Sequence, residues 1–369
     1  MGTKSKRLGL LLVPGLIFLF CFSATAQIQV PCNDPDGDRH GVGCAAGLDC
    51  DQNDPSIYFG APELGCDGKD NNCNGAVDEL VRIEFPDVNL AHSLFVELNP
   101  EDPWLFNTDF CGVTELDLEF CFFYGGPPPE APRTAQIDGD GGPAPIKNLS
   151  GIEYAYEVEY LDLACNQISD LKPLRGLSQL EYLDLSQRNG KSDLRTVQDE
   201  SFASRRLLSD ISPLKKLTNL QYLDLSGNMI RDISPLSKLK KLKELYLAYN
   251  LISDISPLSG LQKLGYLQLL GNLIKRVPAL DLPNLEYLGL NDNSIFDLSG
   301  LAANFKNLEY LDLSGNYISN LKPLVENKNI GEGDDVDLYN NPLTENACHN
   351  QLPKLWDRGV EVDQNVCPE

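Results

Sequence analysis

One eleven-residue phrase, close to Leu-x-Tyr-Leu-x-Leu-x-x-Asn-x-Ile, recurs through the second half of this 369-residue chain. Copies that share the phrase begin at Val158, Leu220, Leu242, Leu264, Leu285 and Leu308. The steps from 220 to 242, 264, 285 and 308 are 22, 22, 21 and 23 residues. A chain built from such copies folds as a quasi-one-dimensional stack, and it offers one long concave sheet as a binding surface.

A period of this size with this pattern is the signature of a leucine-rich-repeat solenoid. Side chains alternate along a strand, so Leu161 and Leu163 point into the core while Tyr160 and Asp162 point to the concave face. We therefore predict an α/β solenoid, a leucine-rich-repeat horseshoe with a parallel concave sheet, a helical N-terminal cap and a C-terminal cap. A small acidic module, stabilised by disulfides and metal, precedes it.

The rest of each repeat follows from the same geometry. The ninth residue of the phrase is expected to turn inward and satisfy backbone groups at the bend, as a buried amide ladder of Asn166, Asn228, Asn250, Asn272, Asn293 and Asn316. Convex segments such as residues 232–236 (Asp-Ile-Ser-Pro-Leu) carry a proline, which suits short 3₁₀ or extended turns. This Asp-Ile-x-Pro-Leu arm at 22-residue spacing resembles the SDS22-like subclass of these proteins.

Both ends of the array are expected to carry caps, because a bare terminal repeat would expose its core edge. Residues 85–98 predict a helix with Leu90, Leu94 and Leu98 on one face. Their phrase Phe-Pro-Asp-x-Asn-Leu-Ala resembles the N-terminal cap of internalin and SDS22-like bacterial proteins. At the other end, the last core edge is expected to be covered by Leu352, Leu355 and Trp356.

The expected organisation has five parts. Residues 1–26 form a signal peptide, 27–79 the acidic module, and 80–157 the N-terminal cap with a degenerate first strand at 114–118. The repeats follow at 158–335, and 336–369 form the last repeat and its cap. The Pro- and Gly-rich stretch 125–145 reads as a surface insertion, with an interdomain linker as the alternative. A polar, locally basic insertion at about 188–206 is either a functional loop or a tolerated one.

The N-terminus indicates export. Lys4, Lys6 and Arg7 precede an apolar stretch at 8–22, and residues 24–26 (Ala-Thr-Ala) fit a cleavage site. The stretch is short for a membrane span, so we expect a removed signal peptide, with an uncleaved anchor as the alternative. No other long apolar run occurs, so we expect no transmembrane segment after signal removal and a secreted or cell-surface location.

The net charge of the chain is −24, or about −27 once the three basic residues of the signal are removed. Phosphate binding needs clustered Lys and Arg, so this balance argues against a nucleic-acid partner. It favours cations or basic partners.

Cysteines in an exported chain indicate disulfides. The chain has eleven, and five crowd the acidic module: Cys32, Cys44, Cys50, Cys66 and Cys73. An odd cluster means that at least one pairs outside it or stays free. Cys111 and Cys121 flank the degenerate first strand and are candidates for a bridge, and Cys348 and Cys367 bracket the C-terminal cap.

Residues 32–79 contain few apolar side chains and many Asp, Asn, Gly and Cys, so they cannot build an ordinary core. Acidic clusters lie at 34–38, 49–54 and 70–79. The third matches the first nine positions of an EF-hand-type calcium loop, with oxygen side chains at alternate positions and a glycine at the sixth: Asp70, Asn72, Asn74, Gly75 and Asp78. Val81 stands at position twelve, so the missing ligand must come from Glu79, Asp67 or another cluster.

The whole stretch resembles a metal-binding motif of bacterial secreted and surface proteins, in its segments CNDPDGDRHG, DCDQNDPSIYFGAPE and CDGKDNNCNGAVDE. Clustered carboxylates suit calcium, whereas copper prefers imidazole and sulfur, so we expect Ca²⁺ rather than copper. A solvated acidic spacer without tight metal is the alternative. The candidate ligands are Asp34, Asp36, Asp38, Asp49, Asp51, Asp54, Asp67, Asp70, Asn72, Asn74, Asp78 and Glu79.

The concave face is expected to carry an aromatic row beside a partly acidic row. Tyrosines are good interface residues, and acidic neighbours favour a basic protein or peptide ligand. The candidate partner-binding residues are Tyr160, Asp162, Tyr182, Asp184, Tyr222, Asp224, Tyr246, Tyr266, Tyr287, Tyr310 and Asp312. Stacking of tyrosines across strands, as a purely structural feature, is the alternative.

No nucleophile motif, phosphate-binding glycine loop or zincin motif occurs, so we expect no enzyme. The sequence predicts an exported recognition or adhesion protein that binds a protein through its concave face. A structural or metal-buffering envelope protein is the alternative, and an acidic-cleft hydrolase is a weaker one.

Overall fold

The computed structural model describes residues 50–54, 57–98, 100, 104–120, 144–187, 208–302, 305–362 and 367. The chain divides into two compact units, Met1–Tyr58 and Phe59–Glu369. The expected signal peptide, the acidic cluster at 34–38 and the insertion at 188–206 lie outside the described residues, as does nearly all of the insertion at 125–145. All elements below belong to the larger unit.

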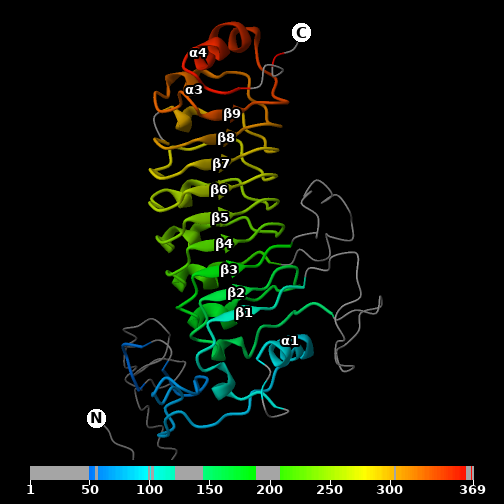
Figure 1. The fold of residues 1–369 in the computed structure, drawn as a ribbon, viewed down its shortest axis with the longest axis vertical. Coiled ribbons are helices and arrows are strands. Elements are labelled where there is room, and N and C mark those ends of the chain that lie inside the picture. The colour runs from blue at the N-terminus through cyan, green and yellow to red at the C-terminus, as the bar shows by residue number, and fades with distance from the viewer. Residues whose placement is uncertain are drawn as a thin grey trace, which may run out of the picture. The chain divides into compact units, whose positions relative to one another are not determined.

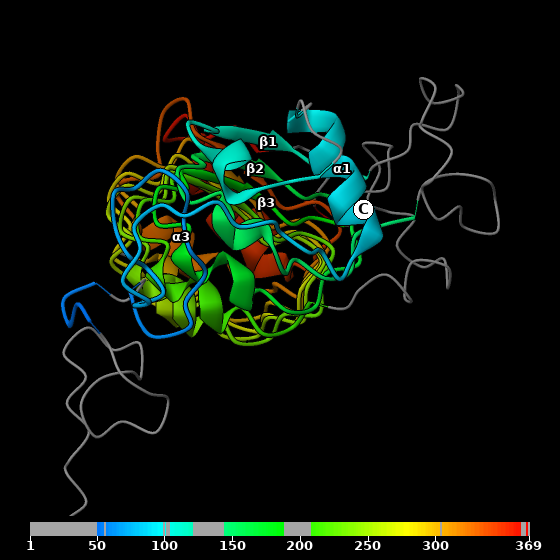
Figure 2. The same cartoon turned by 90° about the horizontal axis from the view of Figure 1, so that it is seen from below.

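Nine short parallel strands form one sheet in sequence order, which confirms the predicted solenoid (Figure 1). The strands are β1 (Glu115–Asp117), β2 (Tyr160–Asp162), β3 (Tyr182–Asp184), β4 (Tyr222–Asp224), β5 (Glu244–Tyr246), β6 (Tyr266–Gln268), β7 (Tyr287–Gly289), β8 (Tyr310–Asp312) and β9 (Asp335–Asp337). Their register aligns equivalent residues of every repeat, so Leu161, Leu183 and Leu223 are neighbours. Viewed along the stack, the turns of successive repeats superpose (Figure 2).

The apolar positions of the phrase form one continuous core, as the alternation predicts. In the repeat around β4, Leu220, Leu223 and Leu225 have no exposed surface. The ninth-position asparagines are also buried, and each bonds backbone groups of its own repeat and of a neighbour. Asn250, for example, donates from Nδ2 to the carbonyls of Leu225 (2.9 Å) and Leu247 (3.2 Å). The predicted amide ladder is confirmed, and Asn341 extends it by one rung.

Short helical turns form the return segments. They are η2 (Ile152–Tyr154), η3 (Lys172–Gly176), η5 (Ser212–Lys216), η6 (Ser234–Lys238), η7 (Ser256–Leu258), η8 (Ser299–Leu301) and the α-helical α3 (Lys322–Glu326). Asp232 shows why they begin where they do, because its Oδ1 accepts the backbone N–H of Ser234 at 2.8 Å. This bond lowers the pKa of Asp232, and proline then occupies an early helical position. The predicted 3₁₀ turns are confirmed.

The N-terminal cap contains α1 (Val88–Leu98) and the 3₁₀ turn η1 (Asn107–Phe110). Leu90 and Leu94 are fully buried, and Leu98 packs against the same core while partly exposed. Asp87 fixes the start of α1, since its Oδ1 accepts the N–H of Asn89 at 2.9 Å. Its Oδ2 accepts the N–H of Lys147 at 2.7 Å, so one carboxylate joins the cap to the first full repeat.

The C-terminal cap contains the π-helical turn η9 (Ala347–Gln351) and α4 (Leu352–Trp356). Leu352 and Leu355 are fully buried, as expected. The prediction for Trp356 is wrong: the side chain is 40% exposed, and its Nε1 donates to the carbonyl of Val362 at 3.4 Å. Within the described residues, no helix is long and apolar enough to span a bilayer.

Two of the disulfides bear on the predicted pairings. Cys348 pairs with Cys367, as expected. Cys111 pairs with Cys66, so its predicted pairing with Cys121 is wrong. The Cys66–Cys111 bond also confirms that the odd cysteine cluster has a partner outside it.

Candidate binding face and acidic loop

Seven tyrosine rings form a continuous row across the sheet, here called the tyrosine row. Tyr160 and Tyr182 stack with ring centroids 4.1 Å apart, and Tyr182 and Tyr222 with centroids 4.3 Å apart. At the other end, the centroids of Tyr266 and Tyr287 are 4.1 Å apart. The members are Tyr160, Tyr182, Tyr222, Tyr246, Tyr266, Tyr287 and Tyr310. Parallel register produces the row, because it places the same position of each repeat side by side.

Strand β5 departs from this pattern. Glu244 takes the tyrosine position, in register with Tyr222 and Tyr266. Tyr246, two residues later, fills the gap in the row, with its centroid 5.3 Å from Tyr222 and 4.9 Å from Tyr266. Its hydroxyl donates to Glu244 Oε2 at 3.0 Å. The expectation of an aromatic row at the third position of the phrase and a separate row at the fifth position is therefore wrong at this strand.

All seven tyrosines are partly exposed, and because stacking covers their ring faces, the accessible surface of the row consists of ring edges and hydroxyl groups. Burial is the main reason that the pKa values of Tyr182, Tyr246 and Tyr266 lie well above the ordinary value. Burial also raises the pKa of Tyr310 to about 12. Tyr182, Tyr246, Tyr266 and Tyr310 therefore stay neutral at physiological pH, and the row offers ring edges and hydroxyl groups.

The aspartates at the fifth position of the phrase are buried: Asp162, Asp184, Asp224 and Asp312. Each accepts the backbone N–H of the residue two positions later, for example Asp184 Oδ1 from Ser186 at 2.8 Å. These bonds shape the end of each strand. Burial raises the pKa of Asp312 against two lowering bonds from Ser314. The more accessible carboxylates lie in the first position of β1, β5 and β9, at Glu115, Glu244 and Asp335, and in the third position of β1 and β9, at Asp117 and Asp337.

The loop at residues 70–79 has the turn structure that its spacing predicts. Asp70 accepts the N–H groups of Asn74 (3.0 Å) and Gly75 (2.7 Å) through its two oxygens. Asn72 Oδ1 accepts the N–H of Asn74 at 3.0 Å, and Asn74 Oδ1 accepts that of Ala76 at 2.8 Å. Gly75 has φ +96°, which explains glycine at the sixth position.

Glu79 turns its carboxylate toward this loop. The side-chain amides of Asn72 (3.1 Å) and Asn74 both donate to Glu79 Oε1, and these bonds lower its pKa. Glu79 Oε2 is out of contact with solvent and has no hydrogen-bond partner in the described structure. A carboxylate oxygen without a partner is a ligand that suits a hard cation, although Asn72 and Asn74 face Glu79 here with their N–H groups rather than with their oxygens. Of the candidates for the missing ligand, Glu79 is the one that the structure brings to Asn72 and Asn74.

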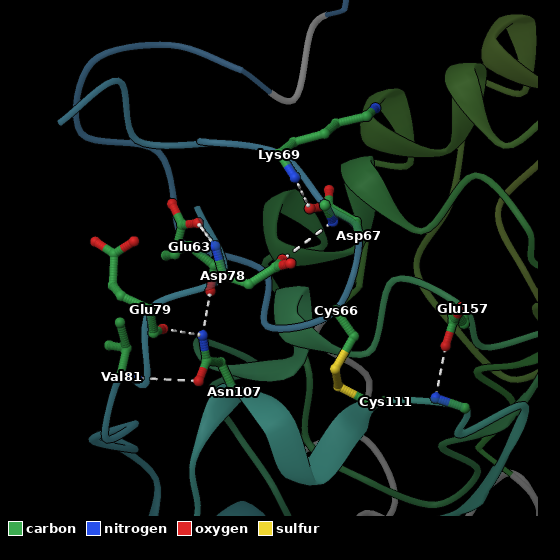
Figure 3. Close-up of a disulfide and its surroundings, with 12 residues drawn as sticks. Glu63, Cys66, Asp67, Lys69, Asp78, Glu79, Val81, Asn107, Cys111 and Glu157 are labelled. Carbon is green, nitrogen blue, oxygen red and sulfur yellow. Dashed lines mark hydrogen bonds between the residues drawn. A yellow bond between two sulfur atoms is a disulfide. The ribbon is translucent and has the colours of Figure 1, made fainter. Parts of the chain in front are cut away.

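Glu63 anchors the same loop from behind, and sequence reasoning missed it. Its carboxylate accepts the N–H groups of Asn72 (3.2 Å) and Asp78 (3.1 Å) and is almost fully buried, which raises its pKa. Asn107 Nδ2 then donates to the carbonyls of Glu63 (3.0 Å) and Glu79 (2.9 Å). These contacts and the Cys66–Cys111 disulfide join the loop to the N-terminal cap (Figure 3).

Three of the remaining metal candidates accept backbone N–H groups. Asp67 accepts the N–H of Lys69 at 3.0 Å, and Asp78 accepts that of Gly68 at 3.1 Å (Figure 3). Asp51 and Asp54 belong to the smaller unit, where Asp51 accepts the N–H of Asn53 at 3.1 Å. The other four lie outside the described residues: Asp34, Asp36, Asp38 and Asp49. Among the residues that are described, no three His, Cys, Asp or Glu side chains gather closely enough to hold a metal by themselves.

Two family models match the chain. The model described as "Leucine Rich repeats (2 copies)" matches residues 157–198, 202–238, 240–282 and 283–326. The model described as "Putative metal-binding motif", named Cu-binding_MopE, matches residues 49–79. No curated protein matches the chain.

Solved structures of similar proteins include internalin C2 of Listeria monocytogenes. It is 30% identical, with a TM-score of 0.50, and the match covers 66% of this chain and 91% of the internalin. A second internalin of that organism, inlF, is 21% identical over 77% of this chain and 96% of its own, with a TM-score of 0.33. A leucine-rich-repeat protein of Leptospira interrogans is 22% identical over 57% of this chain and 68% of its own, with a TM-score of 0.37.

Proposed function

Because the chain belongs to the internalin-like leucine-rich-repeat proteins, we propose that it is an exported, non-enzymatic recognition protein that binds a protein partner on its tyrosine row. Its Asp-Ile-x-Pro-Leu turns favour the SDS22-like subclass, and its disulfides favour an extracellular location. The apolar stretch and cleavage site at residues 8–26 supply the export signal.

The tyrosine row is the observation that carries this proposal. Its rings are held rigidly by their neighbours, so little side-chain entropy is lost when a partner covers them. Their hydroxyls stay protonated and can donate or accept hydrogen bonds.

A triple substitution tests the role of the row. The mature chain is used to capture binding proteins from the native cell surface, and the affinity of the captured partner is then measured. Replacing Tyr222, Tyr266 and Tyr287 by Ser should weaken binding by at least tenfold. The matched control replaces Tyr317 and Tyr339, which are 63% and 60% exposed outside the row, and should leave the affinity unchanged. Equal affinities for the two variants, both folded, would contradict the proposal.

We further propose that the loop at residues 70–79 holds Ca²⁺ through Asp70, Asn72, Asn74 and Glu79. The unpaired Glu79 Oε2 and the all-oxygen donor set support a hard cation over copper. A bound cation would neutralise the carboxylates and stiffen the loop against the cap. The family name that includes copper makes Cu²⁺ the natural competitor in a test.

Calorimetric titration of the full mature chain with CaCl₂ tests this site. Binding should be lost in Glu79→Gln and retained in Asp357→Asn, an exposed acid remote in sequence. The melting temperature should rise with Ca²⁺ in the parent and in Asp357→Asn only. Absence of both heat and thermal stabilisation, or tighter binding of Cu²⁺ than of Ca²⁺, would contradict the calcium assignment.

A further inference from the structure

The first residues of the nine strands follow a pattern with a period of four. Read from β1 to β9, they are Glu115, Tyr160, Tyr182, Tyr222, Glu244, Tyr266, Tyr287, Tyr310 and Asp335. One carboxylate is followed by three tyrosines, then one carboxylate, three tyrosines and one carboxylate. The register pairs each residue with the next in this series. Acidic groups therefore recur at every fourth strand along a neutral aromatic row.

The distance between these carboxylates follows from the sheet itself. Neighbouring strands lie about 4.8 Å apart, so four steps separate successive carboxylates by about 19 Å along the sheet. Glu115 and Glu244 are exposed, and Asp335 is partly exposed. A ligand that lies along the row can reach all three.

Glu244 has the surroundings of a cation-binding group. The carboxylate accepts the hydroxyl of Tyr246, whose ring lies between Tyr222 and Tyr266. These two ring pairs are tilted by 40° and 33°, whereas the other pairs in the row are within 14° of parallel. In the described part of the chain, no Lys or Arg side chain forms an ion pair with Glu244. A carboxylate beside tilted aromatic rings suits a guanidinium group, which can donate to the carboxylate while it contacts a ring.

The carboxylate at β9 is also short of positive charge. The backbone of Asp335 forms an isolated β-bridge with that of Glu361, and Asp335 is in register with Tyr310. Its pKa is raised by burial first and then by the charges of Glu361 and Asp337. A cationic side chain placed there would relieve this repulsion.

We infer that the tyrosine row binds an extended basic segment of a protein partner, whose arginine side chains stand about 19 Å apart and pair with Glu115, Glu244 and Asp335. This inference rests on the proposed function and names the chemistry of the partner. Ring edges and hydroxyl groups between the carboxylates contact the aliphatic or prolyl residues between the arginines.

A polyproline ruler tests the spacing. Polyproline II rises about 3.1 Å per residue with three residues per turn, so arginines six residues apart share a face at about 19 Å. The matched probe is Arg-Pro₅-Arg-Pro₅-Arg. The mismatched probe has the same length and composition, with its three arginines consecutive at the centre. The matched probe should bind the full mature chain at least tenfold more tightly.

Two isosteric variants test whether binding of the matched probe depends on the carboxylate of Glu244. Glu244→Gln should weaken the matched probe about fivefold to tenfold, because it removes one charge-assisted contact while keeping an acceptor for Tyr246. Glu286→Gln removes an equal charge from an exposed residue beside the row and should change affinity less than twofold. No binding of the matched probe, equal binding of both probes, or equal effects of both variants would overturn the inference.

These outcomes are separable from those of the proposed function. If the ruler experiment fails but the triple tyrosine variant still loses the native partner, only the arginine spacing is wrong. If the triple variant keeps the native partner, the proposed binding face itself is wrong.

Discussion

The amide ladder predicts the largest single loss of stability from a polar substitution. Asn250 is 3% exposed, and its Oδ1 accepts the N–H of Ile230 at 3.0 Å. Its Nδ2 donates to the carbonyls of Leu225 and Leu247. Asn250→Ala removes all three partners from buried backbone groups. An unsatisfied buried group costs about 1–3 kcal/mol, so the expected loss is on the order of 4 kcal/mol, reduced wherever water enters.

Urea unfolding measures this loss in two ways. Far-ultraviolet circular dichroism follows the whole array, whereas Trp104 and Trp356 report on the N-terminal and C-terminal caps by fluorescence. Repeats interact mainly with their neighbours, so a break at this inner rung should separate the repeats on either side of it into distinct transitions. Asn284→Ala, which removes an exposed amide bonded to Gln262, is the control and should cost under about 1 kcal/mol. A loss below 1 kcal/mol in Asn250→Ala, with one cooperative transition, would refute the reasoning.

Three other predictions follow from the described contacts. Reducing Cys348–Cys367, whose cysteines are 19 residues apart, should destabilise the C-terminal cap by about 3 kcal/mol, seen as an earlier change in tryptophan fluorescence. The pKa values of Tyr182 and Tyr246 are higher in the folded protein than in the unfolded chain. Their contribution to folding stability is therefore complete below pH 10 and is lost as the pH rises further. Phenolate absorbance, recorded with the melting temperature, should therefore show tyrosines that titrate only as the protein unfolds. Arg358→Met should cost about 2 kcal/mol in urea unfolding, because the guanidinium donates to two carbonyls at the end of α3.

The repetitive part of the fold could be read from the sequence because each position recurs in the same environment. Leucines, the ninth-position asparagines and the proline turns were all predicted, since every neighbour repeats the same choice. Departures from the repeat were harder to predict from the sequence. The order Glu-Leu-Tyr in β5 signals the exchange of Glu244 and Tyr246, but only three-dimensional stacking shows that the ring crosses into the neighbouring position.

The ends of the array depend on contacts that have no period. Cys66 pairs with Cys111 because Asn107 and Glu63 bring the acidic loop to the cap, and no spacing rule predicts that contact. Trp356 looks like a core residue by type, yet its side chain is 40% exposed. The buried position of Glu63 was likewise invisible, because nothing marks its carboxylate as the acceptor for two loop amides.

Hydroxyl-radical footprinting of the mature chain, alone and saturated with its captured partner, tests the central claim most directly. The tyrosine row and two exposed tyrosines outside it report on different surfaces in the same sample. The account predicts protection of Tyr222, Tyr266 and Tyr287, with Tyr317 and Tyr339 labelled as in the free protein. Protection confined to Tyr317 and Tyr339, with the row labelled as before, would contradict it.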